Sequence, residues 1–311
     1  MELGLYTDSV ARLSREDAFA FAQSIGARAI EIAAGGQSSA PHLDRADLLA
    51  SARERQRLLD ELSRHGLRLA ALNCSAWLLH PRSGDEQRRI VEETFTLANL
   101  LGVGTVVTMS GCPGDGPGST TVNWPVYPWP PEVVELRERG WTELLGLWRE
   151  LGPMAADLGL RVALELHPLQ LVFNVPTLLE LRDAAGEVVG ANLDPSHLFW
   201  QQMDPLAVIE ALGPAVHHVH LKDTAIDPTQ VATAGVLDVR TFDDPERRAW
   251  NFRTVGRGHD AGWWRRFVGA LDAWGYDGAL SIEHEDRSID PLVGVAESAA
   301  VASGILAAAT A

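Results

Sequence analysis

The sequence predicts an α/β protein with one (β/α)8 TIM barrel spanning residues 1–311. Short apolar runs rich in Val, Ile, Leu and Ala alternate with helical patterns along the chain, as expected for parallel strands buried on both faces. Eight such runs, at about 39 residues for each strand and its helix, favour a closed barrel over an open sheet. The first strand-to-helix turn, Thr7-Asp8-Ser9-Val10, has no glycine, so the dinucleotide-binding fingerprint of a doubly wound sheet is absent.

The strands and helices are predicted to alternate as follows. The strands are Leu3–Thr7, Ala29–Ala33, Leu67–Asn73, Thr105–Met109, Arg161–Leu166, Val189–Leu193, Val216–Leu221 and Ala279–Ile282. Helices that each stop at a glycine are predicted at Ser14–Ile25, Arg45–His65, Asp85–Leu101, Trp141–Leu158 and Trp263–Trp274. Glycine supplies the left-handed residue that commonly ends a helix, so this repeated order is typical of the αβ loops of a barrel.

Two connections are too long to be plain loops, at about residues 110–131 and 224–259. Both follow the carboxyl end of a predicted strand, which is where barrel enzymes build their sites. Long loops in compact domains commonly serve as lids or binding loops. The first contains Trp124 among prolines and glycines. Because flat aromatic faces suit the C–H faces of a sugar and other aromatic ligands, we expect this loop to cover the mouth of the barrel and stack on a sugar ring or an aglycone. The alternative is that this loop forms a contact between subunits, in which case the protein would be a homodimer.

Composition restricts the function classes. Hydrophobic residues make up 46% of the 311 residues and charged residues 22%, which excludes a disordered chain. A formal charge of −16 repels phosphates and anionic lipids, so we expect neither nucleic acid nor membrane partners. We also expect no apolar run of about 18 residues, and hence no membrane span. The opening segment lacks the pattern of a secretory signal, and Cys74 and Cys112 are far apart, as in reduced cytoplasmic proteins.

Four metal-binding residue types end the last four predicted strands: Glu165, Asp194, His220 and Glu283. Each one alone is more simply a solvated, capping or structural residue. Four in succession at the same structural position predict one metal site on the rim of the barrel. Three carboxylates and one imidazole suit a divalent ion, with Mn²⁺ favoured and Mg²⁺, Co²⁺ or Zn²⁺ as alternatives.

These residues and their neighbours carry a family resemblance. Glu165, Asp194-Pro-Ser-His197, His220-x-Lys222-Asp223 and Ile282-Glu283, with Gly256-Arg-Gly258-His259 and Gly275-Tyr-Asp-Gly278, resemble the xylose-isomerase-like barrel superfamily of sugar isomerases and epimerases. The resemblance covers the chain from the first strand to Glu283. It implies a (β/α)8 barrel that holds one divalent ion on Glu165, Asp194, His220 and Glu283.

The resemblance also implies a mechanism for a sugar isomerase or epimerase. The metal would stabilise an enediolate while Glu165 and Glu283 exchange a proton with the carbon next to a carbonyl. His197 would hold a substrate oxygen, and Lys222 would neutralise developing negative charge or pair with a neighbouring acid. The expected substrate is a small sugar or sugar derivative.

The sequence departs from ketose 3-epimerases at two positions. Those enzymes carry a glutamate six residues after the first metal glutamate and an arginine six residues after the metal histidine, where this chain has Leu171 and Ile226. This argues against epimerisation of a free ketose at C3. The chain instead offers His167, His259 and His80 as further candidates for substrate binding, because histidine exchanges protons near neutral pH.

Three other functions compete with a sugar isomerase or epimerase. A metal-dependent lyase could eliminate the C1 substituent of a 3-keto-glycoside, and the extra histidines and aromatic loop would suit that reaction. Cleavage at apurinic sites needs three zinc ions and further ligands, whereas here the fourth strand ends in Met109-Ser110 and Thr254-Val255 precede the glycine loop. A non-catalytic sugar-binding protein would not need both Glu165 and Glu283 for proton transfer.

Overall fold

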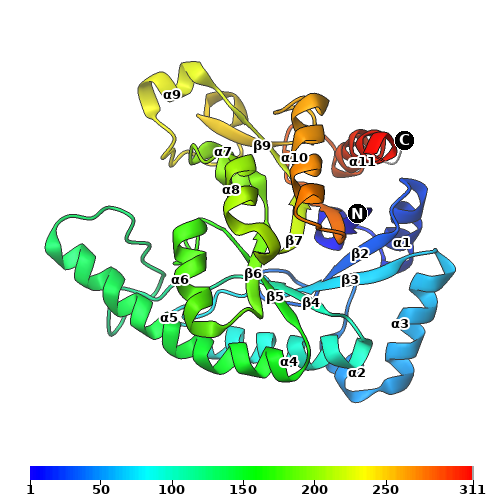
Figure 1. Ribbon diagram of the computed structural model, residues 1–311, viewed down its shortest axis with the longest axis horizontal. Coiled ribbons are helices and arrows are strands. Elements are labelled where there is room, and N and C mark those ends of the chain that lie inside the picture. The colour runs from blue at the N-terminus through cyan, green and yellow to red at the C-terminus, as the bar shows by residue number, and fades with distance from the viewer. Residues whose placement is uncertain (310–311) are drawn as a thin grey trace. The chain divides into compact units, whose positions relative to one another are not determined.

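The structure, a computed structural model, describes residues 1–309 (Figure 1). In this range eight parallel strands are hydrogen-bonded in the order β1-β10-β7-β6-β5-β4-β3-β2, which is a closed barrel. The predicted (β/α)8 fold class is therefore confirmed. The strands are β1 (Glu2–Tyr6), β2 (Ala29–Ala33), β3 (Arg68–Asn73), β4 (Thr105–Thr108), β5 (Arg161–Glu165), β6 (Val189–Leu193), β7 (Val216–Leu221) and β10 (Ala279–Ile282).

The α-helices fill most of the segments between strands. They are α1 (Arg15–Ser24), α2 (Arg45–Ala50), α3 (Ala52–Arg64), α4 (Gly84–Leu101), α5 (Pro131–Asp157), α6 (Val175–Ala185), α7 (Pro195–Trp200), α8 (Pro205–Leu212), α9 (Pro228–Ala234), α10 (Ala261–Ala273) and α11 (Pro291–Ala309). The five glycines expected to end helices all have positive φ, between 66° and 82°: Gly26, Gly66, Gly102, Gly159 and Gly275.

Two predicted helices differ from the structure by more than two residues or in continuity. The single helix expected over Arg45–His65 is interrupted at Ser51, whose backbone is extended and whose Oγ accepts a hydrogen bond from the Glu54 amide at 3.2 Å. Serine at this position caps a new helix, α3, because its hydroxyl satisfies an amide that has no partner within the helix. Helix α5 starts at Pro131 rather than Trp141, where proline's fixed φ suits the first turn.

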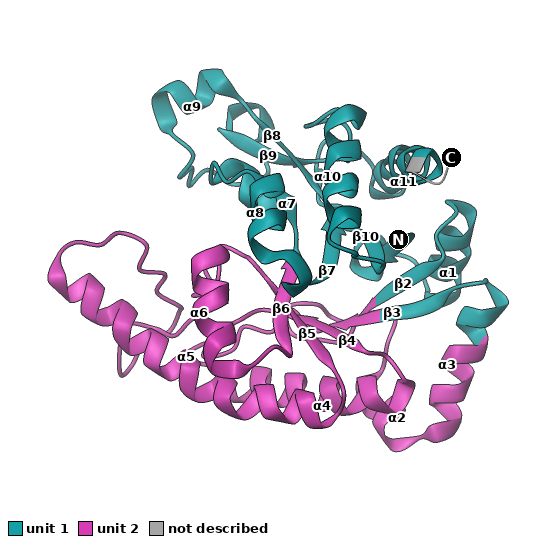
Figure 2. Ribbon diagram, viewed as in Figure 1, with its two compact units in different colours: residues 1–31, 61–70, 193–311 teal, residues 32–60, 71–192 magenta. Residues whose placement is uncertain are grey.

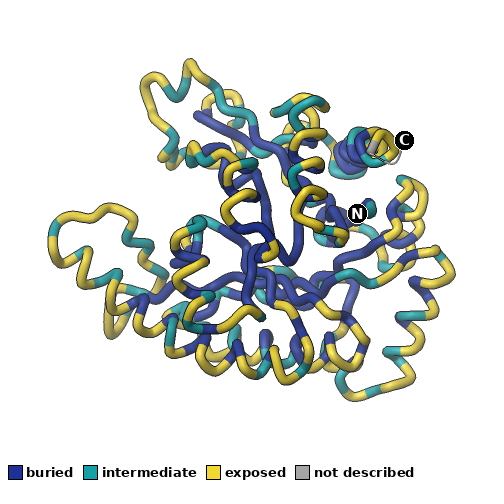
Figure 3. Tube along the Cα trace, in the orientation of Figure 1, coloured by how far each residue is buried: buried dark blue, intermediate teal, exposed yellow. Residues whose placement is uncertain are grey.

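The described chain groups into two compact units (Figure 2). Unit 1 comprises residues 1–31, 61–70 and 193–311, and unit 2 comprises residues 32–60 and 71–192. In both, the barrel strands are buried along most of their length, whereas most helices alternate between buried and exposed positions (Figure 3). Such helices cover the sheet with one apolar face, and α9, which has no buried residue, is an exception.

In unit 1, strand β1 pairs in parallel with both of its neighbours, β2 and β10. Gly4 pairs with Ala29 of β2 and with Ser281 of β10. A Cβ on Gly4 would lie 3.3 Å from the Ser281 hydroxyl, so the absence of a side chain lets the strands pack closely here. Strand β10 pairs in turn with β7, where Ser281 is opposite His220.

Helix α11 of unit 1 corrects one expectation from the sequence. Its residues 291–308 form an apolar window of 18 residues with mean hydropathy 1.6, long and apolar enough to cross a membrane by composition alone. One such helix is weak evidence, because buried helices pass the same test. Val295, Ala299, Ala302 and Ile305 form a buried stripe, and the helix packs against β1, β10 and α10. The segment was overlooked because its apolar character comes largely from alanine.

Unit 2 contains the pairings of β3 with β4, β4 with β5, and β5 with β6. Val107 of β4 is opposite both Asn73 and Ala163, and Glu165 at the end of β5 is opposite Asn192. This register places the carboxyl end of β5 beside the end of β6.

The connection at residues 224–259 has structure of its own within unit 1. Strands β8 (Asp223–Ile226) and β9 (Trp250–Arg253) form an antiparallel hairpin, and α9 lies between them. Trp200 stacks on Trp250 at 4.8 Å between ring centres, and Ile226, Phe242 and Phe252 pack against this pair. The aromatic residues therefore fill a small hydrophobic cluster of the insertion.

Candidate functional site

His220 and Glu283 come from neighbouring parallel strands of unit 1. His220 lies in β7, and Glu283 directly follows β10. Parallel strands end at the same edge of a barrel, which brings the two side chains together. His220 Nδ1 lies 3.0 Å from Glu283 Oε2, and the imidazole is completely buried. Two predicted metal ligands are therefore in direct contact.

Asp194 lies beside this pair. It follows β6 and caps α7, with Oδ1 accepting a hydrogen bond from the Ser196 amide at 2.8 Å. The ligand atoms of Asp194, His220 and Glu283 all lie within 4.8 Å of one another. Three of the four predicted ligands thus form one cluster in unit 1.

Lys222 is a buried cation among carboxylates. Its Nζ lies 3.1 Å from Glu283 Oε2, 2.6 Å from Glu285 Oε2 and 3.7 Å from Asp194 Oδ2. Burial raises the pKa of Glu283, but the charges on Lys222 and His220 outweigh it and hold that pKa well below its ordinary value. Glu283 is consequently a carboxylate at neutral pH.

His197 and Phe252 border the same cluster. His197 Nε2 lies 3.4 Å from Asp194 Oδ2, and its ring meets Phe252 edge-on at 5.5 Å. The Phe252 ring also lies 4.4 Å from Lys222 Nζ. Because Phe252 belongs to β9, the inserted hairpin supplies an aromatic wall next to two predicted substrate-binding residues.

Sequence reasoning overlooked Glu31 and His218. Glu31 lies in β2 and is fully buried, with Oε2 located 2.7 Å from His218 Nε2 and Oε1 located 3.0 Å from His220 Nε2. Burial raises the pKa of Glu31, but the two imidazoles outweigh it and hold that pKa well below its ordinary value. The available signal was an acidic residue inside an apolar run, Ala-Ile-Glu-Ile-Ala, because a fully buried carboxylate almost always has a partner.

His259 has contacts that organise the glycine loop. Asp223 Oδ2 accepts hydrogen bonds from the backbone amides of Gly256, Gly258 and His259, and its Oδ1 lies 2.8 Å from His259 Nδ1. The His259 ring also stacks on Phe199 at 3.8 Å. The structure therefore gives His259 contacts with Asp223 and Phe199, and its predicted role in substrate binding stays a prediction.

Glu165 and His167 belong to unit 2, where Glu165 ends β5 and His167 lies two residues later. Glu165 is buried, and the His167 amide donates to its carbonyl oxygen at 2.8 Å in a tight turn. His167 Nδ1 donates to the Pro168 carbonyl, because a carbonyl can only accept. In the neutral ring the lone pair is then on Nε2.

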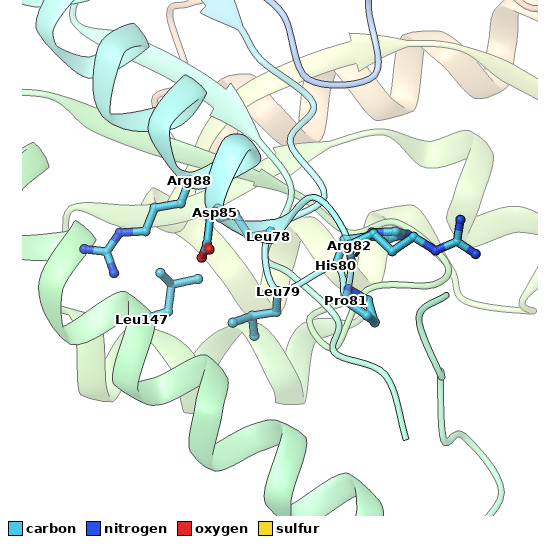
Figure 4. A pocket seen from close by; sticks show the side chains of 9 residues that line it. Leu78, Leu79, His80, Pro81, Arg82, Asp85, Arg88 and Leu147 are labelled. Atoms are coloured by element: carbon cyan, nitrogen blue, oxygen red, sulfur yellow. Dashed lines mark hydrogen bonds between the residues drawn. The ribbon is translucent and has the colours of Figure 1, made fainter. Parts of the chain in front are cut away.

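His80 lies in unit 2 on a pocket of about 310 Å³ (Figure 4). In Figure 4 the pocket lies among the His80 loop, Arg88 of α4 and Leu147 of α5. His80 Nδ1 accepts a hydrogen bond from the Arg82 amide at 3.2 Å and lies 3.1 Å from the Ser83 hydroxyl. These contacts shape the turn before α4, so His80 has a structural role beside its predicted substrate contact.

The loop at residues 110–131 is fixed at its start and exposed towards its end. The Ser110 carbonyl accepts a hydrogen bond from Trp148 Nε1 at 2.8 Å. Trp124 meets Phe173 edge-on at 5.1 Å, whereas Tyr127 and Trp129 are 69% and 68% exposed. Large exposed aromatic side chains are suited to binding, either of a ligand or of another subunit.

The fold and this cluster together define a (β/α)8 barrel in which carboxylate and imidazole side chains that could hold a metal ion lie at the carboxyl ends of strands, the usual place for a barrel active site. The chain belongs to the xylose isomerase-like TIM barrel family, whose family model matches residues 19–304. It is 40% identical over 303 residues to the uncharacterized protein YfiH of Bacillus subtilis, covering 96% of this chain and 97% of that protein.

Solved structures share the fold at low sequence identity. A xylose isomerase-like TIM barrel protein from Mycobacterium smegmatis in complex with magnesium has a TM-score of 0.68 at 16% identity, covering 100% of this chain and 98% of that one. The probable 3-DHS dehydratase AsbF from Bacillus anthracis has a TM-score of 0.68 at 18% sequence identity, covering 97% of this chain and 99% of that one. D-psicose 3-epimerase with D-tagatose, from Clostridium cellulolyticum H10, has a TM-score of 0.63 at 14% sequence identity, covering 98% of each chain.

Proposed function

We propose that this protein is a divalent-metal-dependent sugar isomerase or epimerase that moves a proton at a carbon next to a carbonyl group. The observation that carries the proposal is the cluster of Asp194, His220 and Glu283 at three strand ends of unit 1. The family and the epimerase among the similar structures support sugar chemistry. The substrate is then a small sugar or sugar derivative.

Glu165 is the proposed fourth ligand. It ends β5 opposite Asn192, and Asp194 follows two residues later in the chain. Neighbouring parallel strands present their carboxyl ends at one rim, so this register supports a common site for Glu165 and Asp194.

The donor set fits a hard or borderline divalent ion, because it consists of carboxylates and one imidazole and contains no thiolate. We favour Mn²⁺, and the magnesium complex of a similar barrel supports a divalent ion more generally. When bound, such an ion supplies Lewis-acid stabilisation of the negative charge that develops on a carbonyl oxygen.

The chain's own residues supply the proton transfer. Glu283 is an ionised carboxylate with its Oε2 atom 3.1 Å from Lys222 Nζ, and it would accept the proton from the substrate carbon. Glu165 would return a proton from the other side. Lys222 would then stabilise negative charge on the substrate, and His197 would hold a substrate oxygen.

Epimerisation of a free ketose at C3 is not part of the proposal. Leu171 is buried, and its amide donates to the Gly111 carbonyl. Ile226 packs in the aromatic cluster of the hairpin. Neither position supplies the polar group that ketose 3-epimerases use there.

The metal site is tested first by metal analysis. The purified wild-type protein should contain or take up one divalent ion per chain. Asp194→Asn or His220→Ala should lower the occupancy, whereas Asp204→Asn, at an exposed helix cap of the same unit, should not. A wild-type protein with no dependence on metal, or with three zinc ions per chain, would exclude the proposal.

The reaction is tested by solvent deuterium exchange into a panel of ketoses and 3-keto-glycosides. An isomerase or epimerase returns labelled sugar. Glu283→Gln with full metal occupancy should lose about 10² to 10⁴-fold in turnover, the contribution of a general acid or base. Normal turnover in that variant would rule out its role in proton transfer.

A lyase acting on a 3-keto-glycoside is the second candidate. The favouring observation is that His167 lies two residues after Glu165 and donates from Nδ1 to the Pro168 carbonyl, which orients the imidazole and assigns proton transfer to its Nε2 atom. A dehydratase among the similar structures supports elimination chemistry. Release of the aglycone that is lost in His167→Gln, with no labelled sugar returned, would favour the lyase.

The location proposed for this reaction is the cytoplasm. Cys74 and Cys112 are both free thiols, and both are buried. Reduced cysteines are typical of proteins in a reducing compartment.

A further inference from the structure

We propose that Glu31 is a positioning residue that orients His220 so that its Nδ1 atom binds the metal ion. The inference rests on the proposed metal site. It assigns a task to a buried carboxylate that makes no contact with substrate in the proposed mechanism.

The Glu31 carboxylate contacts the Nε2 atom of two imidazoles, those of His218 and His220. Its Oε2 lies 2.7 Å from His218 Nε2, and its Oε1 and Oε2 lie 3.0 Å and 3.1 Å from His220 Nε2. All three side chains are buried, so water does not compete for these contacts. Ser281 Oγ lies 3.1 Å from His218 Nε2 and completes the group.

These contacts determine which nitrogen of His220 can bind an ion. A carboxylate only accepts hydrogen bonds, so Glu31 requires a proton on Nε2 of His220. Nδ1 faces Glu283 at 3.0 Å and donates to it by the same rule, so an ion bound between His220 and Glu283 would take the place of the Nδ1 proton. Tyr6 stacks on the His220 ring at 5.6 Å and 17°, which fixes the plane of the ring. Metal-binding histidines commonly donate their second nitrogen to a carboxylate in this way.

Glu31→Gln tests this assignment with a side chain of the same size. An amide has one acceptor oxygen and two N–H donors, so it cannot accept hydrogen bonds from both imidazoles through two oxygens. When its nitrogen faces His220, the ring must accept at Nε2 and carry its proton on Nδ1. The lone pair that would bind the ion is then lost.

His218→Gln is the matched control. It removes the other partner of the Glu31 carboxylate and leaves the contact between Glu31 and His220 in place. Both variants disturb the same buried group, so both should unfold at lower temperature than the wild type. Only Glu31→Gln should weaken metal binding beyond that shared disturbance.

The experiment titrates Mn²⁺ into chelator-treated wild-type protein and both variants by calorimetry, after circular dichroism has established that each is folded. We expect one ion per wild-type chain, a Kd about 10 to 100-fold weaker in Glu31→Gln, and less than about threefold weaker in His218→Gln. If Glu31→Gln binds Mn²⁺ with the wild-type Kd, or if both variants lose the same amount of affinity, the inference about Glu31 is overturned while the proposed metal site stands. A wild-type protein that binds no ion overturns the proposed metal site as well.

A second measurement needs no variant. Nitrogen NMR of ¹⁵N-histidine-labelled wild-type protein loaded with Zn²⁺ should show His220 bound through Nδ1 with its proton on Nε2. Binding of the ion through Nε2 would overturn the inference even if Glu31→Gln failed to fold.

Discussion

Asp223→Ala should destabilise the protein strongly, because one buried carboxylate organises the glycine loop. Its oxygens accept hydrogen bonds from the amides of Thr224, Gly256, Gly258 and His259, at 2.8 to 3.1 Å. His259 Nδ1 and Trp264 Nε1 lie 2.8 and 3.3 Å away.

The magnitude follows from this set of contacts. A hydrogen bond contributes about 1 kcal/mol net, and more when the acceptor is charged, but six bonds to one group are not independent. Because the loop can relax in the variant, part of this stabilisation is recovered, and we expect Asp223→Ala to lower the free energy of unfolding by about 4 kcal/mol. For a chain of 311 residues the entropy of unfolding is about 0.65 kcal/mol/K, so the melting temperature should fall by about 6 °C.

Scanning calorimetry and urea unfolding measure this change. Asp204→Ala is the control, because its side chain caps α8 from an exposed position with one bond to the Leu206 amide at 2.9 Å. Loss of such a cap costs about 1 kcal/mol, or about 1 to 2 °C here. A fall in melting temperature for Asp223→Ala no larger than that of Asp204→Ala would refute the reasoning.

Three further predictions concern pH, the aromatic loop and a thiol. Burial raises the pKa of Asp286, but hydrogen bonds from Ser288 and Thr254 outweigh it and lower the pKa from 3.8 to about 2. Its stabilisation of about 2 kcal/mol is present above pH 4 and lost as the pH falls from about 4 to 2. The stability gap between wild type and Asp286→Asn should therefore narrow over that interval, and a constant gap would contradict this. Trp124→Ala should lower turnover or affinity without changing the sedimentation coefficient if the loop binds substrate; dissociation with intact activity would indicate a subunit contact. Burial raises the pKa of Cys74 to about 11, so this thiol should react with a disulfide reagent at pH 8 only on unfolding, and rapid labelling of the folded protein would refute it.

The strands were predictable because their signal is local. Each predicted strand lies within one residue of the observed bounds at both ends, since a parallel strand buried on both faces is a continuous apolar run bounded by polar residues. The first ten residues of α5 were not predicted, because Pro131–Gly140 is largely polar and exposed and carries no apolar stripe. The hairpin of β8 and β9 was missed for a different reason. Its pairing of Thr224 with Phe252 joins segments separated by a helix and an irregular stretch.

The sequence by itself determined the barrel class and the residues that end its strands, including Glu165, Asp194, His220 and Glu283, because both signals follow from the order of residues along each strand. Only the tertiary structure decided which other side chains contact and orient these residues. Glu31 meets His218 from 187 positions away, and Asp223 meets the loop that contains His259. A buried carboxylate shows in the sequence that a partner must exist, but local periodicity carries no information about which distant strand provides it. That choice is made when β2, β1, β10 and β7 pair in register.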